Sequence, residues 1–395
     1  MKLLYYSHSF APNIGGIETI VMSLARGLAD RRGANGEHAF EVTLATQTAA
    51  SEFDDRALPF RVKRQPGLVT LYQLIRAADV VHLAGPALAP LVLAWVARKP
   101  VVMEHHGYQA ICPNGLLVRQ PDATICPGHF QAGHYAKCLR CRTVETSWLR
   151  SVTELLAMFP RNRLAHGVTR NVAISRYEEQ RLCLPSAGVI YHGIEGPLRD
   201  ESFPNEPTRS DGKIRFAYVG RLVPEKGLPV LLRAAEILKG DAGAIEILLI
   251  GDGPERQRLE NIVRQRGLES FVRCTGFLQG ARLADELGRV DVVVMPSAWE
   301  ETAGLAAIEQ MMRGRLVIAS RIGGLAEIVG DGGLTFEAGN AEELASCMRC
   351  VLENPVQIQT IGRAAHERAH KLFLRDRMIT EHARLYCDAR NAKID

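Results

Sequence analysis

The chain has 395 residues, of which 47% are hydrophobic and 23% charged, and its net charge is +4. This composition is typical of a folded globular protein and excludes an intrinsically disordered one. The length exceeds what a single hydrophobic core usually organises, so we expect two domains. No stretch reaches the roughly 18 consecutive apolar residues of a membrane-spanning helix, and the N-terminus lacks a secretory signal pattern. The sequence therefore predicts a cytoplasmic protein.

Charge is unevenly distributed along the chain. Residues 1–190 carry 21 Lys and Arg against 14 Asp and Glu, a net charge of +7, whereas residues 191–395 carry 27 against 30, a net charge of −3. A basic first half suits contact with phosphates or an anionic membrane face, and ordinary solvated arginines explain it equally well. Nucleic acid is not an expected partner, because no basic stripe interleaved with aromatic residues is present.

The first half alternates strands and helices. "KLLYYS" predicts a strand, and the glycine-containing turn "APNIGG" leads to a helix in which Ile17, Ile20, Val21, Leu24 and Leu28 recur at helical spacing. Further strands are predicted at 40–46, 78–85 and 99–107, with a helix at 87–97. Such alternation with apolar strands predicts a parallel sheet covered by helices on both faces.

The same alternation restarts after residue 212. Strands are predicted at 213–220, 244–253, 272–278, 291–297 and 315–320, with helices at 228–240, 254–267, 281–290 and from about Leu305. The segment 366–389 is predicted to be one long helix.

The two halves are separated by a segment that is rich in proline and charge, 196–212. We therefore predict two doubly wound, Rossmann-like α/β domains, at 1–195 and 213–370, with 196–212 as the linker and 371–395 as a C-terminal helix.

Two cations follow the strand that ends at Gly220. In "YVGRLVPEKG", Arg221 and Lys226 lie at a carboxyl end of the predicted sheet, where a guanidinium and an ammonium suit a diphosphate. Arg and Lys are also common on protein surfaces, so this segment alone does not identify a phosphate-binding site. It becomes informative only together with the other motifs of the chain. The turn "IGDGPERQRLE" lacks the third glycine of a dinucleotide fingerprint, and no P-loop pattern occurs, which argues against an oxidoreductase and a P-loop NTPase.

The segment "MPSAWEETAGLAAIEQMMRG" has acids on both sides of a predicted helix start. Glu301 falls in the loop after a buried strand, and Glu309 falls more than a turn inside the helix. Between them, Ala303, Gly304 and Leu305 lie where free backbone N–H groups bind an anion. Carboxylates accept hydrogen bonds from hydroxyls, so the segment suits a ligand with both hydroxyls and phosphates, such as a sugar nucleotide. The neighbouring acid, Glu300, is expected to face solvent.

These elements together resemble the retaining glycosyltransferases of family 4, whose GT-B architecture has two Rossmann-like domains facing across a cleft. The resemblance covers nearly the whole chain, at 11–33, 191–195, 218–238, 248–260, 275–278 and 296–329. It implies transfer of a sugar from a nucleoside-diphosphate sugar to a glycan, lipid-linked or polysaccharide acceptor, with retention of configuration. It also implies that the C-terminal helix returns to the N-terminal domain.

No cofactor is expected for catalysis, and no Asp-x-Asp sequence occurs that would hold a metal on the diphosphate. A nucleotide-sugar epimerase of the same architecture and a non-catalytic sugar-nucleotide-binding protein remain alternatives.

The resemblance also implies roles for individual residues. Arg221 and Lys226 would hold and stabilise the leaving diphosphate. Glu301 would accept hydrogen bonds from hydroxyls of the transferred sugar, with the backbone N–H groups of 303–305 beside it, and Glu309 would bind the ribose.

Two further residues are implied in the N-terminal domain. Gly16, in the first glycine-containing turn, would let the N-terminal domain close over the diphosphate. His106 matches the active-site histidine, with His105 as the competing assignment. The family often has Asn-Gly where this chain has His192 and Gly193, so no donor contact is assigned there.

Four of the nine cysteines gather in an insert at about 107–142 that follows the predicted active-site histidine: Cys112, Cys126, Cys138 and Cys141. A long loop without obvious secondary structure usually needs something to fix it. In a reducing compartment the thiols suggest a structural zinc, with His129 and His134 as substitute ligands. Reduced structural thiols and disulfides or redox sensing remain alternatives, because the spacing fits no standard zinc module. The insert resembles that of a family 4 subgroup with four cysteines.

Residues 146–170 combine arginines with large apolar side chains, the composition of a helix that lies on an anionic membrane. Packing against its own domain is the alternative. Peripheral association with the inner face of the membrane is therefore a hypothesis. The residues that carry it are Trp148, Arg150, Leu155, Leu156, Met158, Phe159, Arg161, Arg163 and Arg170.

Overall fold

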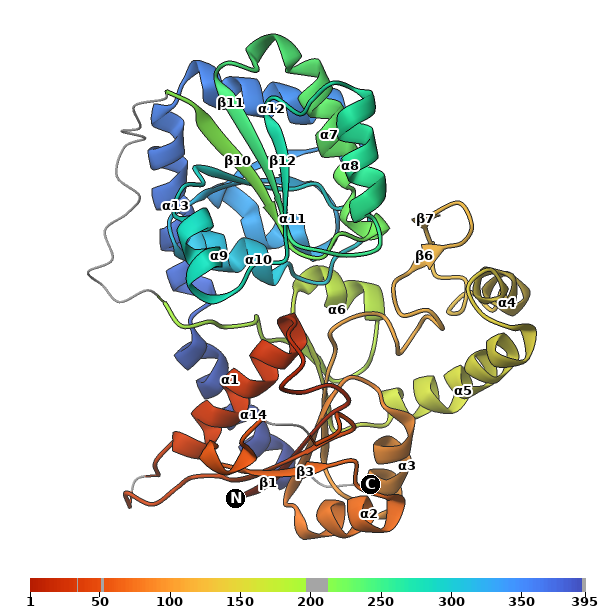
Figure 1. Cartoon of the computed structure of the whole chain (residues 1–395). Helices are drawn as coiled ribbons and strands as arrows, with labels where there is room; N and C mark the ends of the chain where they lie inside the picture. Colours follow the sequence, from red (N-terminus) through yellow and green to blue (C-terminus); the bar gives the residue numbers. More distant parts are fainter. Residues whose placement is uncertain (34, 51–52, 197–211, 393–395) are drawn as a thin grey trace. The chain divides into compact units, whose positions relative to one another are not determined.

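The computed structural model describes residues 1–33, 35–50, 53–196 and 212–392. The chain divides into two compact units: unit 1 comprises Met1–Ile194 and Leu374–Asp395, and unit 2 comprises Glu195–Phe373 (Figure 1). Most of the predicted linker, 197–211, lies outside the described residues.

Unit 1 contains a seven-stranded sheet whose paired strands are all parallel, in the order β3-β2-β1-β4-β5-β8-β9. Its central strands are buried along their length, which explains their apolar sequences. Two ionisable exceptions are fully buried, His82 and Glu104. The strands are β1 (Lys2–Ser7), β2 (Glu41–Thr46), β3 (Arg61–Arg64), β4 (Val80–Ala84), β5 (Val101–Glu104), β8 (Arg170–Ala173) and β9 (Ala187–Val189).

Helices follow the strands of unit 1, as the sequence predicts. In the first helix, Ile20, Val21, Leu24 and Leu28 are buried, whereas Ile17 is partly exposed at 37%. The elements outside the insert are α1 (Gly16–Asp30), η1 (Asp55–Ala57), α2 (Leu68–Ala77), α3 (Leu88–Val96), α5 (Trp148–His166), α6 (Arg176–Leu182) and α14 (Arg375–Asn391).

The cysteine-containing insert has regular structure, contrary to the expectation of a loop. It forms an antiparallel pair, β6 (Val118–Arg119) and β7 (Thr124–Ile125), and the helix α4 (Tyr135–Thr143). Both strands are only two residues long and the helix has little apolar periodicity, so neither produces a clear pattern in the sequence.

The expectation of one long C-terminal helix is wrong. Helix α13 (Val356–Leu372) ends before Phe373, and α14 starts at Arg375 in unit 1. The break lies where the extended Leu374 pairs with Ile194, and the Arg375 N–H donates to the Ile194 carbonyl at 2.9 Å. Helix α14 packs closely on α1, because a Cβ at Gly27 would lie 2.0 Å from Ile379 Cδ1. The C-terminal helix therefore belongs to the N-terminal unit, as the resemblance implies.

Unit 2 contains a six-stranded parallel sheet in the order β12-β11-β10-β13-β14-β15. The predicted doubly wound α/β class is confirmed for both units. The strands are β10 (Ile214–Val219), β11 (Ile245–Ile250), β12 (Val272–Gly276), β13 (Val292–Met295), β14 (Leu316–Ser320) and β15 (Leu334–Phe336). The helices besides α13 are η2 (Pro224–Lys226), α7 (Leu228–Ile237), η3 (Lys239–Asp241), α8 (Arg256–Gln265), α9 (Gly280–Leu287), α10 (Leu305–Met312), α11 (Gly323–Val329), η4 (Gly330–Gly332) and α12 (Ala341–Glu353).

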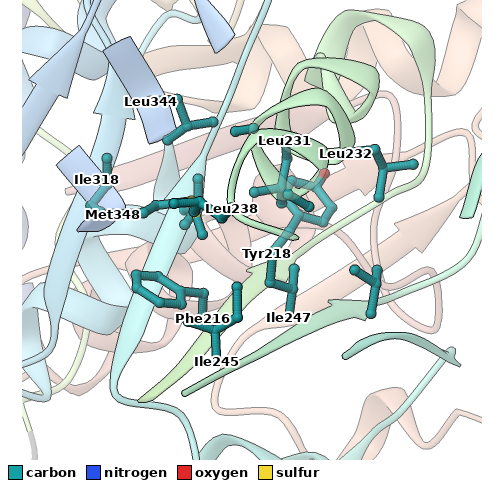
Figure 2. Close-up of a cluster of buried hydrophobic side chains, with 14 of the residues drawn as sticks. Phe216, Tyr218, Leu231, Leu232, Leu238, Ile245, Ile247, Ile318, Leu344 and Met348 are labelled. Atoms are coloured by element: carbon teal, nitrogen blue, oxygen red, sulfur yellow. The ribbon is translucent and has the colours of Figure 1, made fainter. Parts of the chain in front are cut away.

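The core of unit 2 lies between its sheet and the helices α7 and α12 (Figure 2). Phe216 and Tyr218 project from β10 toward the helix side chains Leu231, Leu344 and Met348. Strands β10 and β13 are neighbours, so the loops that follow them emerge side by side at the carboxyl edge of the sheet, where ligands bind in this class of fold.

Candidate functional site

The loops after β10 and β13 meet through a partly buried ion pair. The Lys226 Nζ lies 2.9 Å from the Glu301 Oε1, and the backbone N–H of Ala298 donates to the Glu225 carbonyl at 2.9 Å. Gly227 permits this contact, because a Cβ there would lie 2.0 Å from the Pro296 carbonyl oxygen. Two segments 75 residues apart in the sequence are thus brought together.

Glu301 is held by three groups and is only 4% exposed. Besides Lys226, the Ser297 hydroxyl donates to its Oε1, and the Gly324 N–H donates to its backbone carbonyl at 2.6 Å. The second carboxylate oxygen, Oε2, lies near Gly304, where a Cβ would be 3.7 Å away. Glu301 therefore has one oxygen engaged by protein groups and the other directed toward the start of α10.

Helix α10 starts directly after Gly304, whose φ of +102° is reserved in practice for glycine. The first hydrogen bond in this region runs from the Ala307 N–H to the Gly304 carbonyl at 2.9 Å. The amides before Ala307 therefore lie at the positions that an α-helix leaves without intrahelical acceptors. Such a terminus attracts anions, and the predicted amides of Ala303 and Leu305 belong to it.

The remaining predicted donor residues of unit 2 flank this centre. Glu309 is half-buried on the second turn of α10, and its burial raises the pKa of the carboxyl group. Arg221 is exposed, and the Tyr218 hydroxyl donates to its backbone carbonyl at 2.8 Å. Burial, together with the charge of Glu301, raises the pKa of Tyr218, so its hydroxyl remains a donor.

The expectation that Glu300 faces solvent is wrong, since it is only 6% exposed. The start of α11 packs across the backbone of 300–301: a Cβ on Gly323 would lie 2.8 Å from the Glu300 carbonyl carbon and 2.5 Å from the Glu301 oxygen. This covering depends on residues more than 20 positions further along the chain, so local polarity could not reveal it.

The two neighbouring histidines of unit 1, His105 and His106, differ in their contacts. His105 is fully buried, with its Nε2 2.9 Å from the Asn171 Oδ1, and burial lowers its pKa to about 4. The His106 imidazole has no hydrogen-bond partner for either ring nitrogen among the described residues. His105 thus has a structural contact, whereas the His106 side chain is 4% exposed and its Nε2 lies 3.6 Å from the Glu104 Oε2. The assignment of His106 as the active-site histidine stays a prediction.

Gly16 is exposed as the first residue of α1. It lies in unit 1 with His106, whereas Arg221, Lys226, Glu301 and Glu309 lie in unit 2. Within unit 2 the structure thus brings the predicted residues to one edge of the sheet.

The four insert thiols are free, and three of them are buried. Among the described residues, the side-chain groups whose ligand atoms all lie within 4.8 Å of one another contain only histidine and glutamate, so the thiols are not assembled as a zinc site. Cys138 packs with Phe130 and Met158, and burial raises its pKa to about 12. The features of Cys138 are those of a reduced, protonated thiol in an apolar environment.

Sequence reasoning missed a cluster of ionisable side chains in unit 1. His82, His106, His192 and His382 surround the fully buried Glu104. The available signal was an ionisable residue within each of two apolar strands, "VVHLA" and "VVME".

Helix α5 combines packed and exposed apolar residues. Met158 is fully buried, but Trp148, Leu149 and Leu156 are 62%, 71% and 60% exposed. Within the described part of the chain, no helix has both the length and the apolar content that crossing a membrane requires.

Comparison with known proteins identifies a family. Residues 199–368 match the model for glycosyl transferases group 1. The 2-deoxystreptamine N-acetyl-D-glucosaminyltransferase of Streptomyces fradiae is 30% identical over 343 residues, which cover 80% of this chain and 77% of that protein. The 2-deoxystreptamine glucosyltransferase of Streptomyces kanamyceticus is 33% identical over 181 residues, or 43% of this chain and 46% of that protein. Several curated relatives are thus matched over less than half of their length.

Solved structures show the same fold. HepE of Anabaena, in complex with UDP and glucose, has a TM-score of 0.71 at 20% identity, covering 98% of this chain and 99% of that one. Sucrose-phosphate synthase from Thermosynechococcus elongatus has a TM-score of 0.71 at 20% identity, covering 98% of both chains. Because the Streptomyces fradiae enzyme is matched over more than two thirds of its length, and the family model spans the Lys226–Glu301 site, the chain belongs to the group 1 glycosyltransferases (family 4) with the GT-B fold.

Proposed function

We propose that this protein transfers a sugar from a nucleoside-diphosphate sugar to an acceptor with retention of configuration. Unit 2 is the proposed donor-binding unit and unit 1 the acceptor-side unit. The observation that carries the proposal is the pairing of Lys226 with Glu301 beside the start of α10. It combines a cation and free amides for phosphates with a fixed carboxylate for hydroxyls.

The leaving diphosphate would be stabilised by Lys226, Arg221 and the amides of 303–305. Donors that are fixed before the reaction stabilise developing charge without reorganising, and each is typically worth about 2.7–4 kcal/mol. The ion pair and the Ser297 hydroxyl fix Glu301, and the ion pair also fixes Lys226. Electrostatics would therefore supply most of the rate enhancement, and the transfer needs no metal on the diphosphate.

The sugar and nucleoside would be bound by the two carboxylates. Glu301 would accept from sugar hydroxyls through Oε2, and Glu309 from the ribose. In unit 1, His106 would act as the active-site histidine and Gly16 would allow close approach to the diphosphate. The HepE structures with UDP and UDP-glucose make UDP-sugars the first donors to test.

Release of nucleoside diphosphate from a panel of UDP-, GDP- and ADP-sugars tests the proposal. A transferase releases diphosphate in proportion to acceptor glycosylated. Isomerised donor without an acceptor product would instead identify an epimerase, and saturable donor binding without turnover would identify a non-catalytic binding protein. Glu301→Gln should abolish turnover, whereas Glu246→Gln, which removes an ion-paired carboxylate elsewhere in unit 2, should not.

The acceptor is proposed to be a glycan or lipid-linked glycan, met at the inner face of the membrane. Exposed Trp148, Leu149 and Leu156 on α5, with the exposed Arg150, support peripheral association. Flotation with anionic vesicles should carry the protein upward, and a Leu149→Ser/Leu156→Ser variant should remain in the dense fraction. Equal flotation of both proteins would rule out this face.

The four-cysteine insert is proposed to place the chain in a subgroup of the family. Its buried thiols and its packing on Met158 of α5 support a structural role for the insert. Zinc on these thiols would require them to move closer together. Thiol titration with and without zinc distinguishes reduced thiols from a metal-bound set.

A further inference from the structure

We propose that unit 1 holds a divalent transition-metal ion between Glu104, His82 and His382, which staples the C-terminal helix to the sheet. The three ligands come from β5, β4 and α14, and all three side chains are fully buried. Their ligand atoms lie within 4.8 Å of one another.

The distances in this group suit a shared ion better than hydrogen bonds. The His82 Nε2 lies 3.3 Å from the Glu104 Oε2, and the His382 Nε2 lies 3.7 Å from Oε1. None of these four atoms has a hydrogen-bond partner among the described residues. Two nitrogen or oxygen ligands bound at about 2.0–2.2 Å to one ion lie roughly 3.0–3.6 Å apart. A small inward movement of the side chains would therefore complete the site.

The outer nitrogens of both imidazoles are fixed by other groups. The His382 Nδ1 donates to the Met378 carbonyl at 2.9 Å, and the His82 Nδ1 lies 2.5 Å from the Tyr386 hydroxyl. A carbonyl can only accept, so the His382 proton is on Nδ1 and the Nε2 lone pair faces Glu104. Metal-bound histidines are oriented in this way by partners of the second nitrogen.

A cation would resolve an electrostatic conflict at the centre of unit 1. A buried carboxylate without a hydrogen bond is costly, and here the Nε2 lone pair of His382 faces it, so two acceptors are directed at each other. An ion between the two would satisfy the carboxylate and both histidines.

His106 and His192 form a second group with the same carboxylate, with Nε2 atoms at 3.6 and 3.7 Å. The first group is favoured because both of its histidines have an outer hydrogen bond, whereas His106 has none. Two imidazoles with one carboxylate suit zinc, iron, cobalt or nickel rather than calcium or magnesium.

The consequence concerns the C-terminal helix. Helix α14 comes from the C-terminal end of the chain. Coordination of the ion by His382 would link this helix to β4 and β5. Metal binding of this kind contributes directly to folding free energy. The ion is proposed as a structural element of unit 1, separate from the donor residues in unit 2.

The experiment measures metal in full-length protein purified without a polyhistidine tag or chelator. We expect about one equivalent of metal per chain by mass spectrometry, as isolated or after equilibration with Zn²⁺ or Co²⁺. His382→Gln and His82→Gln should each lower the affinity at least 10-fold, and Tyr386→Phe, which leaves the ligands intact, should lower it roughly 10-fold. Chelation should lower the melting temperature of the wild type but not of His382→Gln.

Two controls make the result specific to this site. His166→Gln removes an exposed histidine from α5, and Cys112→Ser/Cys138→Ser removes two insert thiols; both should keep the metal. Absence of bound metal from wild type equilibrated with Zn²⁺, Co²⁺, Ni²⁺, Mn²⁺ or Fe²⁺ would overturn the proposal, as would metal retained by folded His382→Gln or lost with the thiols.

A spectrum of the metal-loaded wild-type protein tests the ligand assignment without requiring that any variant folds. The Co²⁺-loaded protein should show d–d bands of nitrogen and oxygen ligands. A thiolate-to-cobalt charge-transfer band would place the ion at the cysteines and contradict the assignment.

Discussion

The ammonium of Lys226 lies 2.9 Å from a carboxylate oxygen of Glu301, whose side chain is 5% exposed, whereas that of Lys226 is 19% exposed. Gly323, at the start of α11, packs against the backbone of Glu301, and Lys226 ends the 3₁₀ turn η2. The pair therefore links the two loops that carry the predicted donor residues.

Lys226→Ala should reduce kcat/KM by about 100-fold or more, because each fixed donor to a developing anion is worth about 2.7–4 kcal/mol. Initial rates with saturating acceptor would measure the loss. Lys239→Ala removes a lysine elsewhere in unit 2 that contacts the Arg266 carbonyl, and it should keep the wild-type rate. Equal rates for the wild type and Lys226→Ala would remove Lys226 from the site.

Gly323→Ala should disturb Glu301 without touching any ligand. Its φ is +61°, and a Cβ would lie 2.5 Å from the Glu301 carbonyl oxygen, so the loop must shift. We expect a drop in kcat of about 10-fold or more, since misplacement of about 1 Å can cost about 100-fold. Gly339→Ala is the matched control, because it has a φ of +84° but open space around the Cβ. Similar activity losses in the two variants would attribute the effect to backbone strain alone.

Glu309 should make donor affinity depend on pH. Burial raises its pKa above the usual value of 4.5, and hydroxyl binding needs the ionised form, so donor affinity should fall as the pH drops through this raised value. A pH series of donor KM would show this, and Glu309→Gln should flatten the profile.

The raised pKa of Glu309 should affect stability in the opposite direction: stability should fall, and not rise, as the pH increases through this pKa. A carboxyl whose pKa is raised by folding favours the protonated native state, so it destabilises the protein progressively as the pH rises through that pKa. Glu309→Gln should therefore raise the melting temperature at pH 7 while weakening donor binding. A lower melting temperature at pH 7 would contradict this origin of the shift.

Arg315 should be important for the stability of unit 2. It is 8% exposed and donates to the Leu287 carbonyl at 2.7 Å, to the Val290 carbonyl at 3.3 Å and to the Gln310 side chain at 2.7 Å. Arg315→Ala leaves these acceptors buried without donors, so we expect a loss of about 3 kcal/mol in the free energy of unfolding. Urea denaturation measures it, with Arg273→Ala as an exposed control; equal midpoints would show that the bonds contribute nothing net.

Substitutions of His105 and His106 should have different effects, the first on stability and the second on turnover. His105→Ala removes the contact with Asn171 and should lower the melting temperature. His106→Gln should lower kcat and leave the melting temperature nearly unchanged, because no hydrogen bond is lost. Thermal unfolding and turnover measured on both variants test the assignment, and a reversed pattern would make His105 the active-site residue.

The sequence by itself determined most strands and helices of the two sheets, and it supplied the residues that are proposed to bind the donor. Apolar runs such as "KIRFAYVG" and "AIEILLIG" exceed what solvent-exposed strands tolerate, so the strands β10 and β11 were predictable. The sequence also indicated that the segment around Glu301 and Glu309 suits a ligand. A glycine and small residues at a helix start leave backbone N–H groups accessible to an anion, and a nearby carboxylate accepts hydrogen bonds from hydroxyls.

Only the tertiary structure decided the features that depend on distant residues. The burial of Glu300 arises from α11, and the end of α13 arises from the pairing of Leu374 with Ile194. The group of His82, Glu104 and His382 spans 300 residues of sequence between its first and last members, and no local pattern connects them. Local propensity fixes strands and helix starts, whereas burial and side-chain clustering depend on which elements the sheet order makes neighbours.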